Sequence, residues 1–264
     1  MPSIDRNGVR IHFEDVGSGP PVVLGHSFLC SGEMWASQVP VLAERHRVIN
    51  IDERGHGRSG NLTEPFLLYD MVDDVVAVLD HLGIESAVWA GLSIGGMVAM
   101  RAAMTVAERV SGLLLLDTHA GAETPYKKLK YGVMALGVRM IGVRPFLGEI
   151  SKLMFGITTR RRNTELVAAW RDRFASVDVT SMLLGLGALV RRDSVVDGLR
   201  SVEAPSLVIV GDEDVSLPPK LSREIADALP NASIVVIPEA GHLSALEKPE
   251  AVTEAMLRFL DTVS

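Results

Sequence analysis

A chain of 264 residues with 47% hydrophobic and 22% charged residues has the composition of a globular protein and can bury a large core. Its net charge of −7 gives no electrostatic footprint for binding a nucleic acid. The single cysteine, Cys30, excludes a disulfide within the chain and favours a reducing compartment. Residues 1–14 lack the pattern of a signal peptide, and no apolar run reaches the ~20 residues of a membrane-spanning helix. We therefore expect a cytoplasmic protein without a membrane span.

The chain alternates apolar, strand-like runs with helix-like segments. In chain order the pattern predicts a strand at 9–16, a strand at 22–25, a helix at 34–45, a strand at 46–52, a helix at 70–82, a strand at 86–89, a helix at 97–107, a strand at 110–117, a strand at 206–211, a helix at 219–229, a strand at 233–238 and a helix at 249–263. The first strand is expected to be antiparallel. Strands and helices that alternate at this spacing indicate an α/β fold with a mostly parallel, doubly wound sheet.

One segment interrupts this alternation. Residues 121–200 show helical patterning without a convincing strand, and they are far longer than an ordinary connection. We interpret them as a helical cap inserted between two parts of a core, residues 1–120 and residues 201–264.

The cap also differs from the core in charge. Residues 121–200 contain 14 Lys or Arg and 7 Asp or Glu, a net charge of +7, whereas the remainder carries −14. The basic residues are either solvated helix faces or a positive lip that concentrates anionic substrates. They include Lys127, Lys128, Lys130, Arg160, Arg161, Arg162, Arg191 and Arg192. The cap methionines either line an adaptable pocket or fill the core of the cap; they are Met134, Met140, Met154 and Met182.

The strongest chemical signal is the segment 91–96, with the sequence Gly-Leu-Ser-Ile-Gly-Gly. It lies between a predicted strand and a predicted helix, so Ser93 occupies a sharp strand-to-helix turn. Such a turn forces a positive φ on the serine and leaves no room for side chains at Gly91 and Gly95. It also exposes the hydroxyl at a helix N-terminus, which favours developing negative charge. We therefore expect Ser93 to be a nucleophile.

A serine nucleophile needs a base, and the base needs an acid that orients it. His242 follows the last predicted strand, so it is expected at the same sheet edge as Ser93. Asp214 follows the preceding strand and reaches furthest into its loop, which favours it as the acid. Asp117, after the strand that precedes the cap, is the alternative acid.

Two backbone N–H groups must also stabilise the oxyanion. Ile94, directly after the nucleophile, is expected to supply one of them. Phe28, in the loop after the strand at 22–25, is the candidate for the other. His26 in the same loop is interpreted as a residue that shapes the loop.

Together these residues resemble the α/β-hydrolase superfamily. The matching motifs are His26-Ser27-Phe28, Asp52-x-Arg54-Gly55-His56-Gly57-x-Ser59, Gly91-x-Ser93-x-Gly95-Gly96, Gly211-x-x-Asp214 and Gly241-His242-x4-Glu247-x-Pro249. The resemblance implies an eight-stranded sheet with the cap between the sixth and seventh strands, the triad Ser93, Asp214 and His242, no cofactor and no metal. It implies no catalytic role for His56. The expected substrate-binding residues are Ser27, Leu29, Leu92 and Leu243.

Some positions point to a subfamily. Ser27 stands where many esterases have glycine and where 3-oxoadipate enol-lactonases have serine, and Trp35 and Gln38 are similar to residues of those lactonases. Cofactor-free haloperoxidases and perhydrolases usually have proline at the position of Leu29, which argues against that activity. Epoxide hydrolases and haloalkane dehalogenases use an aspartate nucleophile, and Ser93 argues against both.

The sequence therefore predicts a serine hydrolase that cleaves small carboxylic esters or lactones through an acyl-enzyme. A ligand receptor with slow turnover and a hydrolase of C–C bonds in diketones would use the same residues. The acyl and alcohol groups, and the choice between monomer and homodimer, stay open.

Overall fold

The computed structural model describes residues 2–263 and contains one mixed sheet of eight strands. The strands are β1 Ser3–Arg6, β2 Val9–Gly17, β3 Pro21–Gly25, β4 Arg47–Asp52, β5 Ala87–Leu92, β6 Val110–Leu116, β7 Ser206–Gly211 and β8 Ala232–Ile237. Their order across the sheet is β1-β2-β4-β3-β5-β6-β7-β8. β2 is antiparallel to both of its neighbours, and the other pairs are parallel. The predicted α/β fold with a mostly parallel sheet is confirmed.

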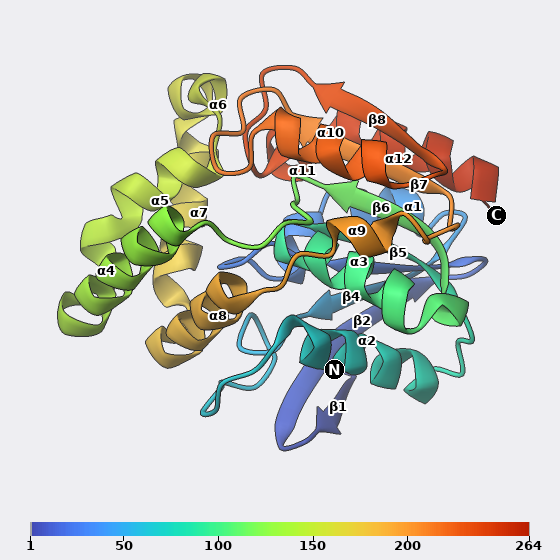
Figure 1. Cartoon of the computed structure of the whole chain (residues 1–264), viewed down its shortest axis with the longest axis horizontal. Coiled ribbons are helices and arrows are strands. Elements are labelled where there is room, and N and C mark those ends of the chain that lie inside the picture. The colour runs from blue at the N-terminus through green and yellow to red at the C-terminus, as the bar shows by residue number, and fades with distance from the viewer. Residues whose placement is uncertain (1, 264) are drawn as a thin grey trace.

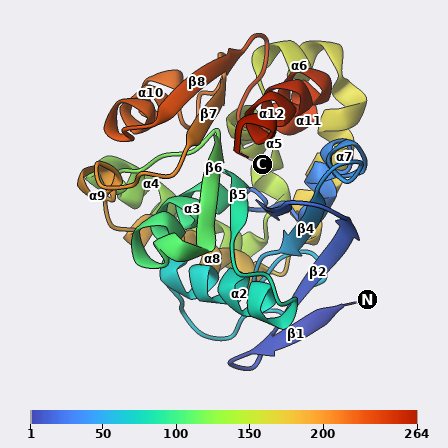
Figure 2. The ribbon, with the colours of Figure 1, turned by 90° about the vertical axis from the view of Figure 1, so that its right-hand side faces the viewer.

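Helices cover both faces of this sheet (Figures 1 and 2). They are η1 Gly32–Trp35, α1 Gln38–Leu42, α2 Leu68–His81, α3 Ile94–Thr105, η2 Ala107–Arg109, α4 Pro125–Ile141, η3 Arg144–Phe146, α5 Leu147–Met154, α6 Ile157–Arg162, α7 Thr164–Ser176, α8 Val179–Arg191, α9 Val196–Leu199, α10 Pro219–Ala228, α11 Ser244–Glu247 and α12 Pro249–Val263. One face packs against α2, α3, α9 and α10, and the other packs against α1, α11 and α12.

The sequence of β6 shows why both faces are covered. Leu113 and Leu115 belong to the apolar cluster beneath α2, α3 and α10, whereas Leu114 and Leu116 belong to the cluster beneath α1 and α12. Successive side chains of a strand point to opposite faces, so an unbroken leucine run is stable only when both faces are buried.

Two local features differ from the prediction. β1 was not expected, because its four residues are polar or half-exposed at the sheet edge and form no apolar run. The single helix predicted at 34–45 is instead a 3₁₀ turn at Gly32–Trp35 followed by the short α1. Pro40 explains the break: proline lacks an N–H and clashes with the preceding turn, so a helix containing it must begin within a few residues before it.

The segment between β6 and β7 is helical, as predicted, and α4 to α8 form a separate layer beyond the ends of the strands (Figure 1). Within this layer α4 packs on α8 and α5 packs on α7. No single helix within residues 2–263 has the length and apolar character of a membrane span; α7 and α8 meet that test only when taken together across a bend of 98°.

A buried ion pair ties the loop after β4 to α2. Arg54 donates hydrogen bonds through Nε and Nη2 to the two carboxylate oxygens of Asp74, each at 2.6 Å. Both side chains are buried, and the Arg54 guanidinium lies 5.4 Å from the centre of the Phe66 ring. Removal of one partner from such a pair leaves an uncompensated charge in the interior.

Asp74→Asn is therefore expected to lower the free energy of unfolding by about 3–5 kcal/mol. Asp73 provides a matched control, because it is exposed and pairs with Arg6 at 3.0 Å near the surface. Asp73→Asn should cost less than about 1 kcal/mol. Urea denaturation of the three proteins measures the difference, and equal losses in the two variants would contradict a special role for the buried pair.

Candidate active site

A serine with strained backbone stands at the end of β5. Ser93 has φ 57° and ψ −111°, a conformation that residues other than glycine rarely adopt. The turn leaves no room for neighbouring side chains: a Cβ at Gly91 would lie 2.2 Å from the Gly95 carbonyl carbon, and one at Gly95 would lie 2.5 Å from the Gly25 carbonyl oxygen. Ser93 thus occupies the predicted sharp turn at the N-terminus of α3.

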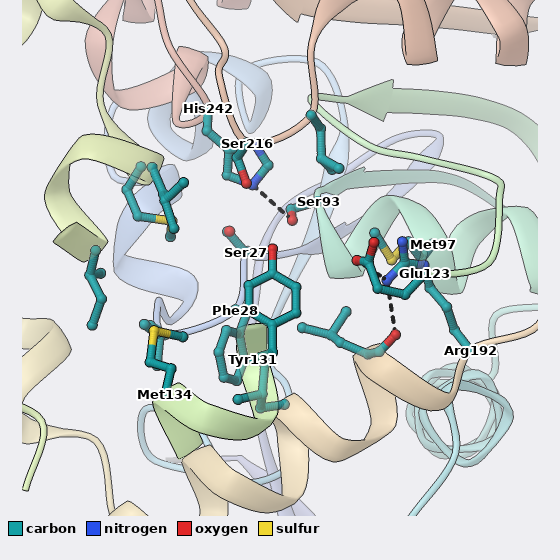
Figure 3. Close-up of a pocket in the computed structure, with 17 residues that line it drawn as sticks. Ser27, Phe28, Ser93, Met97, Glu123, Tyr131, Met134, Arg192, Ser216 and His242 are labelled. Atoms are coloured by element: carbon teal, nitrogen blue, oxygen red, sulfur yellow. Dashed lines mark hydrogen bonds and ion pairs between the residues drawn. The ribbon is translucent and has the colours of Figure 1, made fainter. Parts of the chain in front are cut away.

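Three side chains that follow three different strands form one hydrogen-bonded chain. Nε2 of His242 lies 2.9 Å from Oγ of Ser93 (Figure 3), and Nδ1 of His242 lies 2.8 Å from Oδ2 of Asp214. Asp214 follows β7 and His242 follows β8, so both lie at the sheet edge where β5 ends. All three residues are buried. A serine hydroxyl bonded to an imidazole that a buried carboxylate orients is the arrangement that activates serine as a nucleophile.

Asp214 is oriented by its own loop. Its Oδ1 accepts hydrogen bonds from the backbone N–H groups of Ser216 at 2.8 Å and Leu217 at 2.9 Å, which leaves Oδ2 for His242. Burial lowers the pKa of His242, but the charge and hydrogen bond of Asp214 outweigh this effect. The pKa of His242 therefore lies above the ordinary histidine value of 6.5.

The alternative acid, Asp117, is turned toward other partners. Its Oδ1 accepts a hydrogen bond from the Gly211 N–H at 2.9 Å, and its Oδ2 accepts from the N–H and hydroxyl of Ser244. Burial and the nearby charge of Asp214 raise the pKa of Asp117. Asp117 thus links the end of β7 to the start of α11, and the carboxylate that accepts a hydrogen bond from His242 is that of Asp214.

Glu247 holds the loop that carries His242 in place. Its Oε1 accepts from the N–H groups of Gly241 at 2.9 Å and Leu243 at 3.3 Å, and its Oε2 accepts from the Gly156 N–H of the cap at 2.9 Å. One carboxylate therefore joins the histidine loop to the cap. In the sequence, the signal for this role of Glu247 is its position in the motif, five residues after His242 and two before Pro249.

Two backbone N–H groups beside Ser93 are free. Ser93 donates its own N–H to the Leu116 carbonyl at 2.9 Å, and Gly95 donates to the His26 carbonyl at 3.2 Å. The N–H groups of Phe28 and Ile94, in contrast, donate to no acceptor among residues 2–263. These are the two donors that the sequence predicts for an oxyanion hole.

A cavity with a free volume of about 110 Å³ lies against Ser93 and His242. Its walls come from the loop after β3, from the cap and from the loop after β7, and they are mostly apolar: Phe28, Leu29, Met97, Met134, Met154 and Leu217. Figure 3 shows Tyr131 rising from α4 toward Ser27 and Ser93. Ser27 Oγ is buried, lines the cavity and has no hydrogen-bond partner within residues 2–263.

A buried ion pair forms one side of the cavity (Figure 3). Arg192 Nη1 donates to Glu123 Oε2 at 3.1 Å, and Arg192 Nε donates to the Gly121 carbonyl at 2.9 Å. Burial and the charge of Arg192 lower the pKa of the neighbouring His119 to about 4. Glu123 and Tyr131 could not be predicted as lining residues, because no local motif marks a residue that reaches the site from a cap.

The structure corrects several expectations about substrate contacts. Ser27 and Leu29 line the cavity, but Leu92 and Leu243 do not; both are fully buried in the apolar cluster beneath α1 and α12, because they belong to packed elements beside the turn. Of the basic residues named for a positive lip, only Arg192 is among the described residues that line the cavity.

The cap methionines and Gln38 differ in whether they line the cavity. Met134 and Met154 line the cavity, whereas Met182 is buried in the cap and Met140 is exposed. Gln38 donates to carbonyls of residues 245 and 249 and to Thr253, and it does not line the cavity.

Two histidines near the site shape the loops around it. Nε2 of His26 accepts a hydrogen bond from the Glu53 N–H at 2.9 Å, and its Nδ1 lies 2.8 Å from the Ser27 carbonyl oxygen. Nδ1 of His56 lies 3.0 Å from the Arg54 carbonyl oxygen, and neither ring lines the cavity. Within residues 2–263 no group of three or more His, Cys, Asp or Glu side chains is arranged to hold a metal ion.

Comparison with known proteins agrees with this geometry. A family model described as "alpha/beta hydrolase fold" matches residues 20–249. The chain is 32% identical over 261 residues to the "Putative non-heme bromoperoxidase BpoC" of Mycobacterium tuberculosis, covering 97% of this chain and 99% of the relative. A thermophilic esterase from Thermogutta terrifontis has a TM-score of 0.93 at 33% identity, covering 99% of this chain and 97% of the esterase. The enol-lactonase from Burkholderia xenovorans LB400 has a TM-score of 0.92 at 28% identity, covering 98% of this chain and 100% of the lactonase. The chain therefore belongs to the alpha/beta hydrolase fold family.

Proposed function

We propose that this protein is a serine hydrolase that cleaves small carboxylic esters or lactones. The observation that carries the proposal is the hydrogen-bonded chain from Asp214 through His242 to Ser93, which ends at an apolar cavity. The similarity along nearly the whole chain to structures described as an esterase and an enol-lactonase supports it.

In the proposed first step, Ser93 Oγ attacks the carbonyl carbon of the substrate while Nε2 of His242 takes the hydroxyl proton. The carbonyl oxygen becomes an oxyanion and accepts hydrogen bonds from the free N–H groups of Phe28 and Ile94. Asp214 stabilises the imidazolium that forms and keeps its Nε2 directed at Ser93. The imidazolium then gives its proton to the leaving alkoxide as the C–O bond breaks, and an acyl-enzyme remains.

In the second step, water takes the place of the leaving alcohol. His242 removes a proton from the water as its oxygen attacks the acyl carbon, and the second tetrahedral intermediate uses the same two N–H donors. Breakdown of this intermediate returns the proton to Ser93 Oγ and releases the carboxylic acid. A lactone follows the same steps, except that the alcohol stays attached to the released acid.

The cavity favours a small, uncharged substrate. Its free volume of about 110 Å³ is close to that of cavities (~150 Å³) that hold a benzene-sized molecule. Arg192 is already neutralised by Glu123, so a substrate carboxylate would have to compete with that residue. Ser27 Oγ, buried without a partner, supplies a hydrogen bond to a polar atom of the substrate.

Ser93→Ala is expected to reduce kcat by about 10⁶, because nucleophile and base act as a unit. Circular dichroism should show an unchanged fold. Ser216→Ala is the matched control: it removes another serine hydroxyl from the same cavity and should leave kcat within about tenfold. Hydrolysis of p-nitrophenyl acetate measures both, and activity of Ser93→Ala near that of the wild type would exclude Ser93 as nucleophile.

The pH profile tests the base and its acid. Only neutral His242 accepts a proton, so kcat/KM should rise with pH through an apparent pKa above the ordinary 6.5. Asp214→Asn removes the main group that raises this pKa, so the rise should move to lower pH while kcat falls by about 10⁴. Asp117→Asn removes a weaker influence and should cost much less. A larger loss in Asp117→Asn than in Asp214→Asn would identify Asp117 as the orienting acid.

Acyl-chain length tests the cavity. For p-nitrophenyl esters kcat/KM is expected to rise from acetate to butyrate as methylenes enter the apolar walls, and then to fall by at least about tenfold for decanoate, which exceeds the available volume. Met134→Ala enlarges the wall contributed by α4 and should move the optimum to longer chains. An unchanged optimum in this variant would show that the cavity does not hold the acyl group.

A further inference from the structure

The outer face of α4 carries an apolar stripe that nothing else within residues 2–263 covers. Its members are between 59% and 76% exposed and recur at alternating steps of three and four residues: Tyr126, Leu129, Val133, Leu136 and Met140. An α-helix turns once every 3.6 residues, so this spacing places all five on one side. Contiguous exposed apolar side chains of this kind mark an interaction surface.

The stripe is separate from the face of α4 that serves the cavity. Tyr131 and Met134 line the cavity, and Val138 is buried in the apolar cluster of the cap. These three residues lie on the opposite side of the helix from the stripe. The inner face of α4 therefore packs against the cap core and the cavity, whereas the apolar side chains of its outer face have no packing role within residues 2–263.

The charges of α4 favour a negatively charged binding partner. The helix contains Lys127, Lys128, Lys130 and Arg139 and no acidic residue, although the whole chain has a net charge of −7. Lys128, Lys130 and Arg139 are exposed, and none of them forms a salt bridge within residues 2–263. The next acid after the helix, Glu149, is paired with Lys152 at 2.6 Å.

We propose that the outer face of α4 binds an anionic lipid surface. A helix with large apolar side chains along one side and lysine or arginine beside them lies in the plane of a membrane interface, with its apolar side in the acyl boundary and its cations at the anionic headgroups. Lys128, Lys130 and Arg139 lie beside the stripe and can extend to headgroup level, whereas Lys127 points inward and donates to the Ser216 carbonyl at 3.2 Å. Figure 1 shows α4 at the outer edge of the cap, so docking leaves the sheet and the lining of the cavity undisturbed.

A second copy of the chain fits this face less well. In a two-fold contact the same patch meets itself, so the cations of one α4 would approach those of its partner without any carboxylate from either helix. Like charges brought together oppose association, whereas phosphatidylglycerol or another anionic lipid neutralises them.

The test is cosedimentation of the full chain with vesicles of phosphatidylcholine alone or of phosphatidylcholine and phosphatidylglycerol in equal parts. We expect binding to the anionic vesicles only, weakening as salt rises from ~0.01 M to ~0.15 M and the Debye length falls from ~30 Å to ~8 Å. Leu129→Ser with Leu136→Ser should weaken partitioning at least about tenfold, and Lys128→Gln with Lys130→Gln should do so by about tenfold at low salt.

Matched controls change the same residue types on other surfaces. Val41→Ser with Val236→Ser alters exposed aliphatic residues outside α4, and Lys220→Gln with Arg223→Gln alters exposed cations of α10; both should bind as the wild type does. Ser93→Ala should also bind normally, which separates this inference from the proposed hydrolysis. Equal binding to neutral and anionic vesicles, no binding to either, or a dimer in sedimentation velocity that the Leu129 and Leu136 substitutions dissociate would each overturn the proposal.

Discussion

The close packing of glycines around Ser93 is the constraint on which the site depends. The strained turn at Ser93, with φ 57°, brings the backbone of Gly95 close to both Gly91 and Gly25, so a Cβ at Gly91 or Gly95 would lie closer to its neighbours than real atoms allow. This packing joins β3, β5 and α3 at one point. It also holds the loop that carries Phe28 against the turn, where the Gly95 N–H donates to the His26 carbonyl at 3.2 Å. The strained backbone of Ser93 and the approach of this loop therefore depend on the same packing.

The parallel sheet brings the remaining groups to this point. β5, β7 and β8 end at the same edge, so residues 149 positions apart in the sequence, Ser93 and His242, come within hydrogen-bond distance. Two further carboxylates hold the surrounding segments. Asp117 links the end of β7 to the start of α11, and Glu247 links the loop that carries His242 to Gly156 of the cap. Of these three acidic residues, Asp214 contacts the imidazole, and Asp117 and Glu247 hold the surrounding loops.

The cap contributes walls of the cavity. It adds apolar walls and one buried ion pair to the cavity, while the exposed apolar stripe of α4 lies on the other side of that helix. The excess of basic residues in residues 121–200 is consequently not gathered around Ser93. Arg192 is the only Lys or Arg residue among the described residues that line the cavity, and it forms an ion pair with Glu123. The inner face of α4 thus lines the cavity, whereas its outer face is exposed.

By itself the sequence determined those features that short-range rules specify. A strand-to-helix turn with glycine on both sides of a serine specifies the sharp turn at Ser93, and residues after successive parallel strands meet at one sheet edge. These two rules placed Ser93 and His242 together and left Asp214 and Asp117 as alternative acids. Tertiary structure decided between the two acids, because Asp214 is hydrogen-bonded to His242, whereas Asp117 bonds to Gly211 and Ser244. Tertiary structure alone decided which side chains face the cavity. Leu92 is adjacent to the nucleophile yet buried beneath α1 and α12, whereas Tyr131 and Glu123 reach the cavity from the cap. Helix packing sets that choice, because the rotation and position of each cap helix depend on contacts between residues distant in the sequence.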